Sequence, residues 1–158
     1  MESIKKRTIL VADDDPDDFY LLKDALSEAG VDCDLRVASD GTELMDYLLH
    51  KKEFMAPENA PYPVFILLDL NMPKKNGREA LAEIKSIENL KQIPVIVYTT
   101  SDEPEDIRDC YAMGANSFVR KPASFDSLVD TMKSMTAYWF NIANLPPPHV
   151  EILEGRRS

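Results

Sequence analysis

The sequence predicts an α/β fold in which a five-stranded parallel sheet, with strand order 2-1-3-4-5, carries helices on both faces. Short apolar segments rich in strand-forming residues alternate five times with segments of helical periodicity. Two of these segments, VFILL and PVIVY, are continuous apolar runs, as expected for strands buried on both faces. Right-handed crossovers would place the carboxyl ends of all strands on one edge of the sheet, and 2-1-3-4-5 is a common order for such chains.

The expected strands differ in their apolar pattern. Residues 31–37 alternate apolar with polar side chains, which predicts an edge strand with one solvated face. The two continuous runs should lie in the middle of the sheet, where both faces are covered. The predicted strands cover residues 8–12, 31–37, 64–68, 94–98 and 117–120.

The first predicted helix has clear start and stop signals. Asp15 is placed as its N-cap, Pro16 suits its first position, and Gly30 should end it. Asp17 and Asp18 fall in its first turn, where the helix dipole favours negative charge. The other helices are expected around residues 44–49, 80–84, 104–114 and 125–139, the last one capped by Ser124.

One domain of residues 1–145 is expected, followed by a flexible tail of residues 146–158 and no output domain. The sequence LPPP marks this boundary. Residues 50–63 contain three prolines and predict a long loop, to which the sequence assigns no chemistry. Trp139 and Phe140, near the end of the last helix, either cover the core or extend a partner contact.

The composition is that of a soluble globular protein, with 44% hydrophobic and 29% charged residues. A formal net charge of −10 argues against nucleic acid and anionic membrane as partners. Cys33 and Cys110 are too few for a disulfide framework or a thiolate metal site, so both are interpreted as reduced packing residues. Because no signal peptide or membrane-spanning run is found, a cytoplasmic location is expected.

Polar side chains follow four of the predicted strands. Asp13 and Asp14 follow the first strand, Asp69 the third, Thr99 the fourth and Lys121 the fifth. In the order 2-1-3-4-5 the first and third strands are neighbours, so the three carboxylates should face one another. Unit charges ~4 Å apart interact by about 4 kcal/mol at an effective dielectric near 20, so a cation besides the lysine is needed. An oxygen-only set of ligands favours Mg²⁺.

These groups are equipped for phosphoryl chemistry. Asp69 would attack phosphorus, while Mg²⁺ and Lys121 neutralise the equatorial oxygens and Thr99 donates a hydrogen bond to the transferred group. Unlike the acids of the first helix, Asp13 and Asp14 have no structural explanation. The strand ends therefore predict a single functional site.

Four motifs make the chain resemble the receiver domain of two-component response regulators, which has a flavodoxin-like (βα)5 fold. They are the acid pair after ILVA, Asp69 within LLDLNMPKKNG, Thr99 after PVIVY, and Lys121-Pro122 after SFVR. The chain length, the 50–63 loop and the aromatic end of the last helix resemble the single-domain cyanobacterial phytochrome response regulators.

The resemblance implies that Asp69 accepts a phosphoryl group from a phosphohistidine on a sensor histidine kinase, of the phytochrome type if the subclass holds. Asp14 and Asp69 would ligate Mg²⁺ together with the backbone carbonyl of Asn71, and Asp13 would act through water. The protein would be no enzyme beyond catalysing its own phosphorylation and dephosphorylation.

The resemblance also implies a switch. Thr99 and Lys121 would bind the phosphoryl oxygens, the Lys121-Pro122 bond would be cis, and Phe118 would turn inward as Thr99 moves toward the phosphate. Asn71 and Ser101 stand where the family tunes hydrolysis of the acyl phosphate. Output would be a protein contact through the last two helices and the Phe118 strand, made with a downstream or phosphotransfer partner or in a homodimer.

Two other interpretations remain open at this point. A Mg²⁺-dependent haloacid-dehalogenase-like phosphatase also uses a strand-end aspartate, but generally carries a second Asp two residues later, where this chain has Asn71. A binding module could keep the fold without being phosphorylated, although the presence of Asp14, Asp69, Thr99 and Lys121 argues against it.

Overall fold

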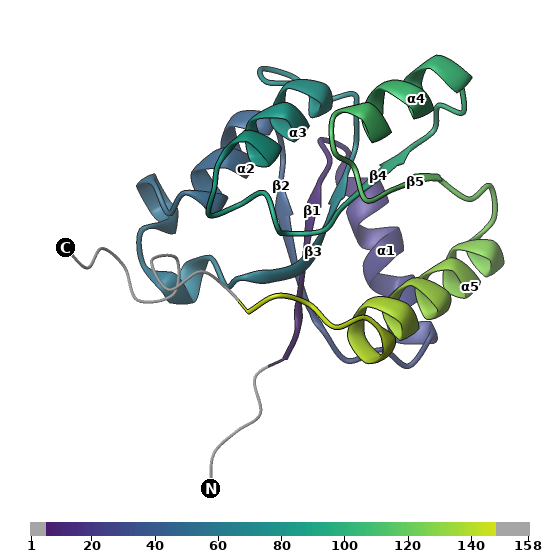
Figure 1. Ribbon diagram of the computed structural model, residues 1–158. Coiled ribbons are helices and arrows are strands. Elements are labelled where there is room, and N and C mark those ends of the chain that lie inside the picture. Colours follow the sequence, from purple (N-terminus) through teal and green to yellow (C-terminus); the bar gives the residue numbers. More distant parts are fainter. Residues whose placement is uncertain (1–5, 148–158) are drawn as a thin grey trace, which may run out of the picture.

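The protein folds around one parallel sheet whose strands lie in the order β2-β1-β3-β4-β5 (Figure 1). The structure is a computed structural model and describes residues 6–147. All four pairs of neighbouring strands are parallel, so the predicted fold class and strand order are confirmed. The strands are β1 (Thr8–Ala12), β2 (Asp34–Ala38), β3 (Pro63–Leu68), β4 (Val95–Thr99) and β5 (Ser117–Arg120).

Helices cover both faces of the sheet and bury two separate apolar clusters (Figure 1). One cluster lies under α1 and α5, and the other lies under α2 and α3. Cys110 of α4 is fully buried in the second cluster, and both cysteines are free, as expected of packing residues. The helices are α1 (Pro16–Glu28), α2 (Gly41–Leu48), α3 (Gly77–Ser86), α4 (Pro104–Ala112) and α5 (Phe125–Thr136).

The helix signals read from the sequence act as predicted. The Asp15 side chain accepts a hydrogen bond from the backbone N–H of Asp17 at 3.0 Å, and Pro16 opens α1. Gly30 follows the helix with a φ of 75°, a conformation that glycine adopts without steric cost. Ser124 caps α5 in the same way through the backbone N–H of Ser127.

The sheet register brings the carboxyl ends of β1 and β3 level with each other. Ala12 pairs with Leu68, and the backbone N–H of Asp69 donates to the carbonyl of Ala12 at 2.9 Å. Between β4 and β5, the N–H of Lys121 donates to the carbonyl of Thr99 at 2.7 Å. Backbone hydrogen bonds of the sheet therefore hold Asp69 and Lys121 at the end of the sheet where the strands have their carboxyl ends.

The second strand differs from its prediction. β2 begins at Asp34 rather than at residue 31, because its partner strand β1 begins only at Thr8, which pairs with Asp34. Cys33 still packs against the cluster under α1 and α5, but Val37 is 39% exposed. β2 is at the edge of the sheet, as expected, so one of its long sides has no neighbouring strand among residues 6–147.

The long connection before β3 is an ordered segment. It contains two 3-10 turns, η1 (Lys52–Phe54) and η2 (Pro57–Asn59), and Ala60 is buried. The hydroxyl of Tyr47 on α2 donates to the carbonyl of Pro61 at 2.7 Å, and the rings of Tyr47 and Phe54 lie 5.2 Å apart. Packing against α2 therefore gives the segment its shape.

The aromatic residues that directly follow α5 cover the core. A π-helical segment, η3 (Ala137–Ile142), continues α5 and places the rings of Trp139 and Phe140 at 6.4 and 6.1 Å from the fully buried ring of Phe65. The two residues thus cover part of the core, and the partner contact stays a prediction. Of the predicted tail, residues 148–158 lie outside the described residues, so the domain boundary stays a prediction. No helix in the described range is long and apolar enough to cross a membrane.

Candidate functional site

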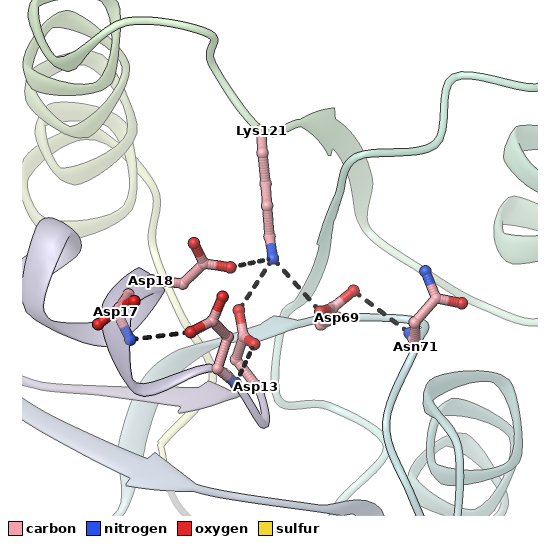
Figure 2. A network of polar contacts seen from close by, with 7 residues as sticks. Asp13, Asp17, Asp18, Asp69, Asn71 and Lys121 are labelled. Atoms are coloured by element: carbon pink, nitrogen blue, oxygen red, sulfur yellow. Dashed lines mark hydrogen bonds and ion pairs between the residues drawn. The ribbon is translucent and has the colours of Figure 1, made fainter.

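Three carboxylates, of which Figure 2 shows those of Asp13 and Asp69, meet at the carboxyl ends of β1 and β3. Asp13, Asp14 and Asp69 each offer an oxygen atom, and these oxygens lie within 4.8 Å of one another. Asp13 and Asp69 are buried, with 3% and 7% of their surface exposed, whereas Asp14 is exposed. The predicted convergence of the strand-end acids is therefore present.

Gly77 allows α3 to start directly against this edge. A Cβ atom at position 77 would lie 2.3 Å from the backbone oxygen of Asp69, so only glycine fits there. The N–H of Gly77 donates to the carbonyl of Leu70 at 3.0 Å, and the N–H of Asn71 donates to Asp69 Oδ1 at 3.3 Å. The turn after β3 thus fixes the orientation of the Asp69 carboxylate.

Lys121 reaches into the acid cluster from the end of β5. Its Nζ atom lies 2.9 Å from Asp13 Oδ2, 3.3 Å from Asp69 Oδ2 and 2.7 Å from Asp18 Oδ2 (Figure 2). The lysine side chain is only 12% exposed. Its place beside Asp13 and Asp69 is the one predicted from the sequence.

The contact of Asp18 with this lysine was missed. Its position in the first turn of α1 suggested only an interaction with the helix dipole. The sequence did contain a signal for this contact. Because α1 starts two residues after Asp14, its first turn must lie close to the carboxyl end of β1, where the acids meet. Three carboxylates, those of Asp13, Asp18 and Asp69, therefore contact one ammonium group, and Asp14 is the fourth acid of the site.

Burial shifts the protonation equilibria of these groups. It raises the pKa of Asp13 to about 6, against the lowering effects of the Asp15 N–H and of Lys121. Burial alone would lower the pKa of Lys121, but its hydrogen bonds to Asp18 and Asp13 and the charge of Asp69 raise that pKa above its ordinary value. The lysine is thus cationic at neutral pH and is outnumbered by acids.

The donor set suits a hard divalent cation. All the converging ligand atoms are carboxylate oxygens, and the excess of negative charge around them favours a second cation besides Lys121. Asn71 borders the cluster through its backbone N–H. The residues present therefore fit a metal of the magnesium type.

Thr99 is fully buried at the end of β4, and its hydroxyl lacks a partner. It is the one buried side-chain polar atom without a hydrogen bond in residues 6–147. Such groups are rare in folded proteins because an unpaired buried hydroxyl costs free energy. An oxygen atom of a bound group would satisfy it.

The predicted cis bond before Pro122 is wrong. The peptide bonds of the described residues, the Lys121-Pro122 bond among them, are all trans. The trans form is the ordinary preference of such bonds, by about 0.5–1 kcal/mol. Lys121 reaches Asp13 and Asp69 from the trans arrangement.

Phe118 lies on β5 and is partly buried against the cluster under α2 and α3. Its backbone N–H donates to the hydroxyl of Tyr111 on α4 at 3.2 Å. The residue therefore connects β5 with both the core and α4.

Comparison with known proteins identifies the family. A family model described as the response regulator receiver domain matches residues 9–133. The chain belongs to the response-regulator receiver family. This assignment places it among signalling proteins and not among the haloacid-dehalogenase-like phosphatases considered from the sequence.

Three relatives span nearly all of this receiver. Response regulator Rcp1 of Synechocystis sp. is 37% identical over 145 residues, covering 92% of this chain and 97% of the relative. A crystal structure of RPA3017, described as acting in red light signaling of R. palustris, has 35% identity and a TM-score of 0.85, covering 89% of this chain and 99% of that one. The phosphorylated cyanobacterial phytochrome response regulator RcpA has 39% identity and a TM-score of 0.81, covering 91% and 100%.

One solved form of Rcp1 contains Mn²⁺. That structure has 36% identity to this receiver and a TM-score of 0.78, covering 89% of this chain and 99% of that one. A relative thus binds a divalent cation, the class of ion that the acid cluster of this receiver fits.

Proposed function

We propose that Asp69 accepts a phosphoryl group from a phosphohistidine on a sensor histidine kinase, and that phosphorylation changes the protein contacts of the receiver. One observation supports this above all others. A buried carboxylate, Asp69, lies 3.3 Å from the ammonium of Lys121, whose side chain is only 12% exposed at the end of β5. The strand between them, β4, ends in a buried hydroxyl, that of Thr99, which lacks a partner.

The proposed reaction is a transfer between two nucleophiles. An oxygen of Asp69 attacks phosphorus, the P–N bond of the phosphohistidine breaks, and its electron pair returns to the imidazole nitrogen. Lys121 and Thr99 bind the oxygens of the transferred group. Water then attacks phosphorus, the bond to the Asp69 oxygen breaks, and inorganic phosphate leaves, which returns the free Asp69 carboxylate. The receiver would thus promote both its own phosphorylation and its own dephosphorylation.

Asp14, Asp69 and the backbone carbonyl of Asn71 would hold Mg²⁺, with Asp13 acting through a water molecule. When bound, the cation neutralises the charge of the transferred group. Mg²⁺ is proposed because the protein offers few ligands, all of them oxygen, and Mg²⁺ usually keeps several of its waters.

The proposed output is a change in packing. Phosphorylation replaces one carboxylate charge with roughly two phosphate charges, which attracts Thr99 and Lys121. Movement of Thr99 would let Phe118 turn further inward and alter the face formed by α4, β5 and α5. A downstream or phosphotransfer protein, or a second copy of this chain, would read that face.

The kinase is proposed to be of the phytochrome type, and the receiver is proposed to act in the cytoplasm. The first proposal is supported by the 39% identity to RcpA, whose description names a phytochrome, over 91% of the chain. The second follows from partnership with the catalytic part of a kinase that uses cytoplasmic ATP.

Intact mass after incubation with acetyl phosphate and Mg²⁺ tests the proposal. One added phosphoryl group is expected in the wild type and none in Asp69→Asn. The adduct should disappear after the donor is removed. If the wild type gains no adduct and also binds no beryllium fluoride, which mimics the phosphoryl group without hydrolysing as an acyl phosphate, the proposal is wrong.

A further inference from the structure

The nearest partner of the Lys121 ammonium is Asp18 and not the proposed phosphoacceptor. The Nζ atom lies 2.7 Å from Asp18 and 3.3 Å from Asp69, with Asp13 at 2.9 Å. Asp18 comes from the first turn of α1 and belongs to none of the strand-end motifs. We propose that Asp18 is a positioning residue that holds Lys121 toward α1 and so weakens the binding of a phosphoryl group at Asp69.

This inference rests on the proposed function of Asp69. An ammonium group has three N–H donors, and three carboxylates accept from this one. A phosphoryl oxygen must therefore displace one of them. The lysine is only 12% exposed, so water cannot readily supply substitute partners during the exchange.

The three carboxylates are not equivalent in this exchange. Phosphorylation itself removes the charged oxygen of Asp69, and a divalent cation would compete with Lys121 for Asp13. Asp18 is neither the residue that would be phosphorylated nor a member of the acid cluster that would hold the cation. In Figure 2 its carboxylate approaches the ammonium from a different side than that of Asp69, so its attraction draws the donor away from the phosphoacceptor.

The negative charge of Asp18 acts in the same direction. It adds a fourth carboxylate to a site that must accept a dianionic group. Its side chain is 29% exposed, so solvent screens the charge in part. For a partly exposed pair we expect a moderate effect, about threefold in affinity.

Asp18 also has a simpler role, because an acid in the first turn of a helix favours the helix dipole. Asp17 provides the matched control. It lies in the same turn of α1, carries the same charge and is exposed, and its carboxylate makes no hydrogen bond or ion pair with any of residues 6–147. Replacing either aspartate by asparagine removes one negative charge from the first turn of α1. Both variants therefore lose one unit of negative charge and one favourable interaction with the helix dipole.

The test measures the equilibrium affinity of the full chain for beryllium fluoride at saturating Mg²⁺. Asp18→Asn should bind about threefold more tightly than the wild type, and Asp17→Asn should stay within about 1.5-fold. Asp18→Glu, which keeps the charge, should return the affinity toward the wild-type value. The Mg²⁺ affinity of each variant is measured separately, so that a change at the metal is not mistaken for a change at Lys121.

The reaction rate gives an independent measurement. With acetyl phosphate, Asp18→Asn should raise the ratio of the maximal rate to the half-saturating donor concentration, because Lys121 becomes available to the donor. Asp18→Ser serves as a second variant if the amide fails to fold. Affinity and rate in Asp18→Asn or Asp18→Ser that equal those of Asp17→Asn, or fall below the wild type, would overturn the role of Asp18. Failure of the wild type itself to bind either reagent would instead overturn the proposed function of Asp69.

Discussion

Arg78 on α3 forms an ion pair with Asp106 on α4. Asp106 also accepts a hydrogen bond from the Ser101 hydroxyl at 2.6 Å. This hydrogen bond and the neighbouring guanidinium hold the pKa of Asp106 below its ordinary value. Arg78, Asp106 and Ser101 line a cavity of about 360 Å³ together with Asn71. Asp106 thus links the loop that follows Thr99, through Ser101, to α3, through Arg78.

Breaking this pair should loosen the loop. In Arg78→Gln, amide hydrogen exchange is expected to become several-fold faster around residues 101–103, with only a small loss of global stability because the pair is partly exposed. Arg108→Gln is the control, because Arg108 is an exposed arginine on α4. Equal exchange in the two variants would show that the pair does not restrain the loop.

Removing the Thr99 hydroxyl should stabilise the resting protein while weakening phosphoryl binding. Thr99→Val keeps the shape of the side chain and removes an unpaired buried hydroxyl, so a gain of about 1 kcal/mol in the free energy of unfolding is expected. Beryllium fluoride should bind about tenfold more weakly, because a hydrogen bond to a charged group is lost. Urea denaturation and titration measure the two effects, and Thr99→Ser should retain binding. A Val variant that is less stable than the wild type would contradict the expectation.

Phe118 should transmit the change at Thr99 to α4. NMR chemical shifts of the wild type are expected to change around Thr99 and on α4 when beryllium fluoride is added. In Phe118→Ala the changes around Thr99 should remain and those on α4 should shrink. Phe125→Ala on α5, a 40% exposed ring, is the control. Undiminished changes on α4 in the Phe118 variant would rule out the switch role.

Phe65 should be a main contributor to stability. Its ring is fully buried and contacts the rings of Trp139 and Phe140. Phe65→Ala should lose about 3–5 kcal/mol of unfolding free energy, whereas Ile142→Ala, at a position 66% exposed, should change it by less than about 0.5 kcal/mol. Trp139 is the single tryptophan, so its fluorescence reports unfolding directly. A loss below that of Ile142→Ala would contradict the packing.

Metal binding should weaken in mild acid. The pKa of Asp13 in the folded, metal-free protein is about 6, above its ordinary 3.8, so this carboxyl carries a proton at pH 5 and is ionised at pH 7. Because a cation favours the ionised form, Mg²⁺ affinity should rise as the pH increases through 6 and then level off, with a slope of up to about tenfold per pH unit below 6. Titrations between pH 5 and 7 measure this. Asp13→Asn should flatten the profile, and an unchanged slope in that variant would assign the proton to another group.

Local signals in the sequence were enough to predict most of the architecture. Apolar runs and helix caps act within a few residues, so the strand order, the cap residues and the strand-end positions of Asp13, Asp69 and Lys121 followed from pattern and topology. The start of β2 was placed three residues too early, because a strand needs a partner, and β1 begins only at Thr8.

The sequence by itself determined which residues stand at the edge of the sheet, since alternation of strand and helix leaves the parallel strands one common carboxyl end. The tertiary structure alone decided how their side chains pair. Asp18 and Lys121 are 103 positions apart in the chain, and their contact depends on where α1 starts and how the lysine extends from β5. Likewise, only packing decided that Trp139 and Phe140 cover Phe65. Such contacts depend on three-dimensional distance, which periodicity along the chain does not encode.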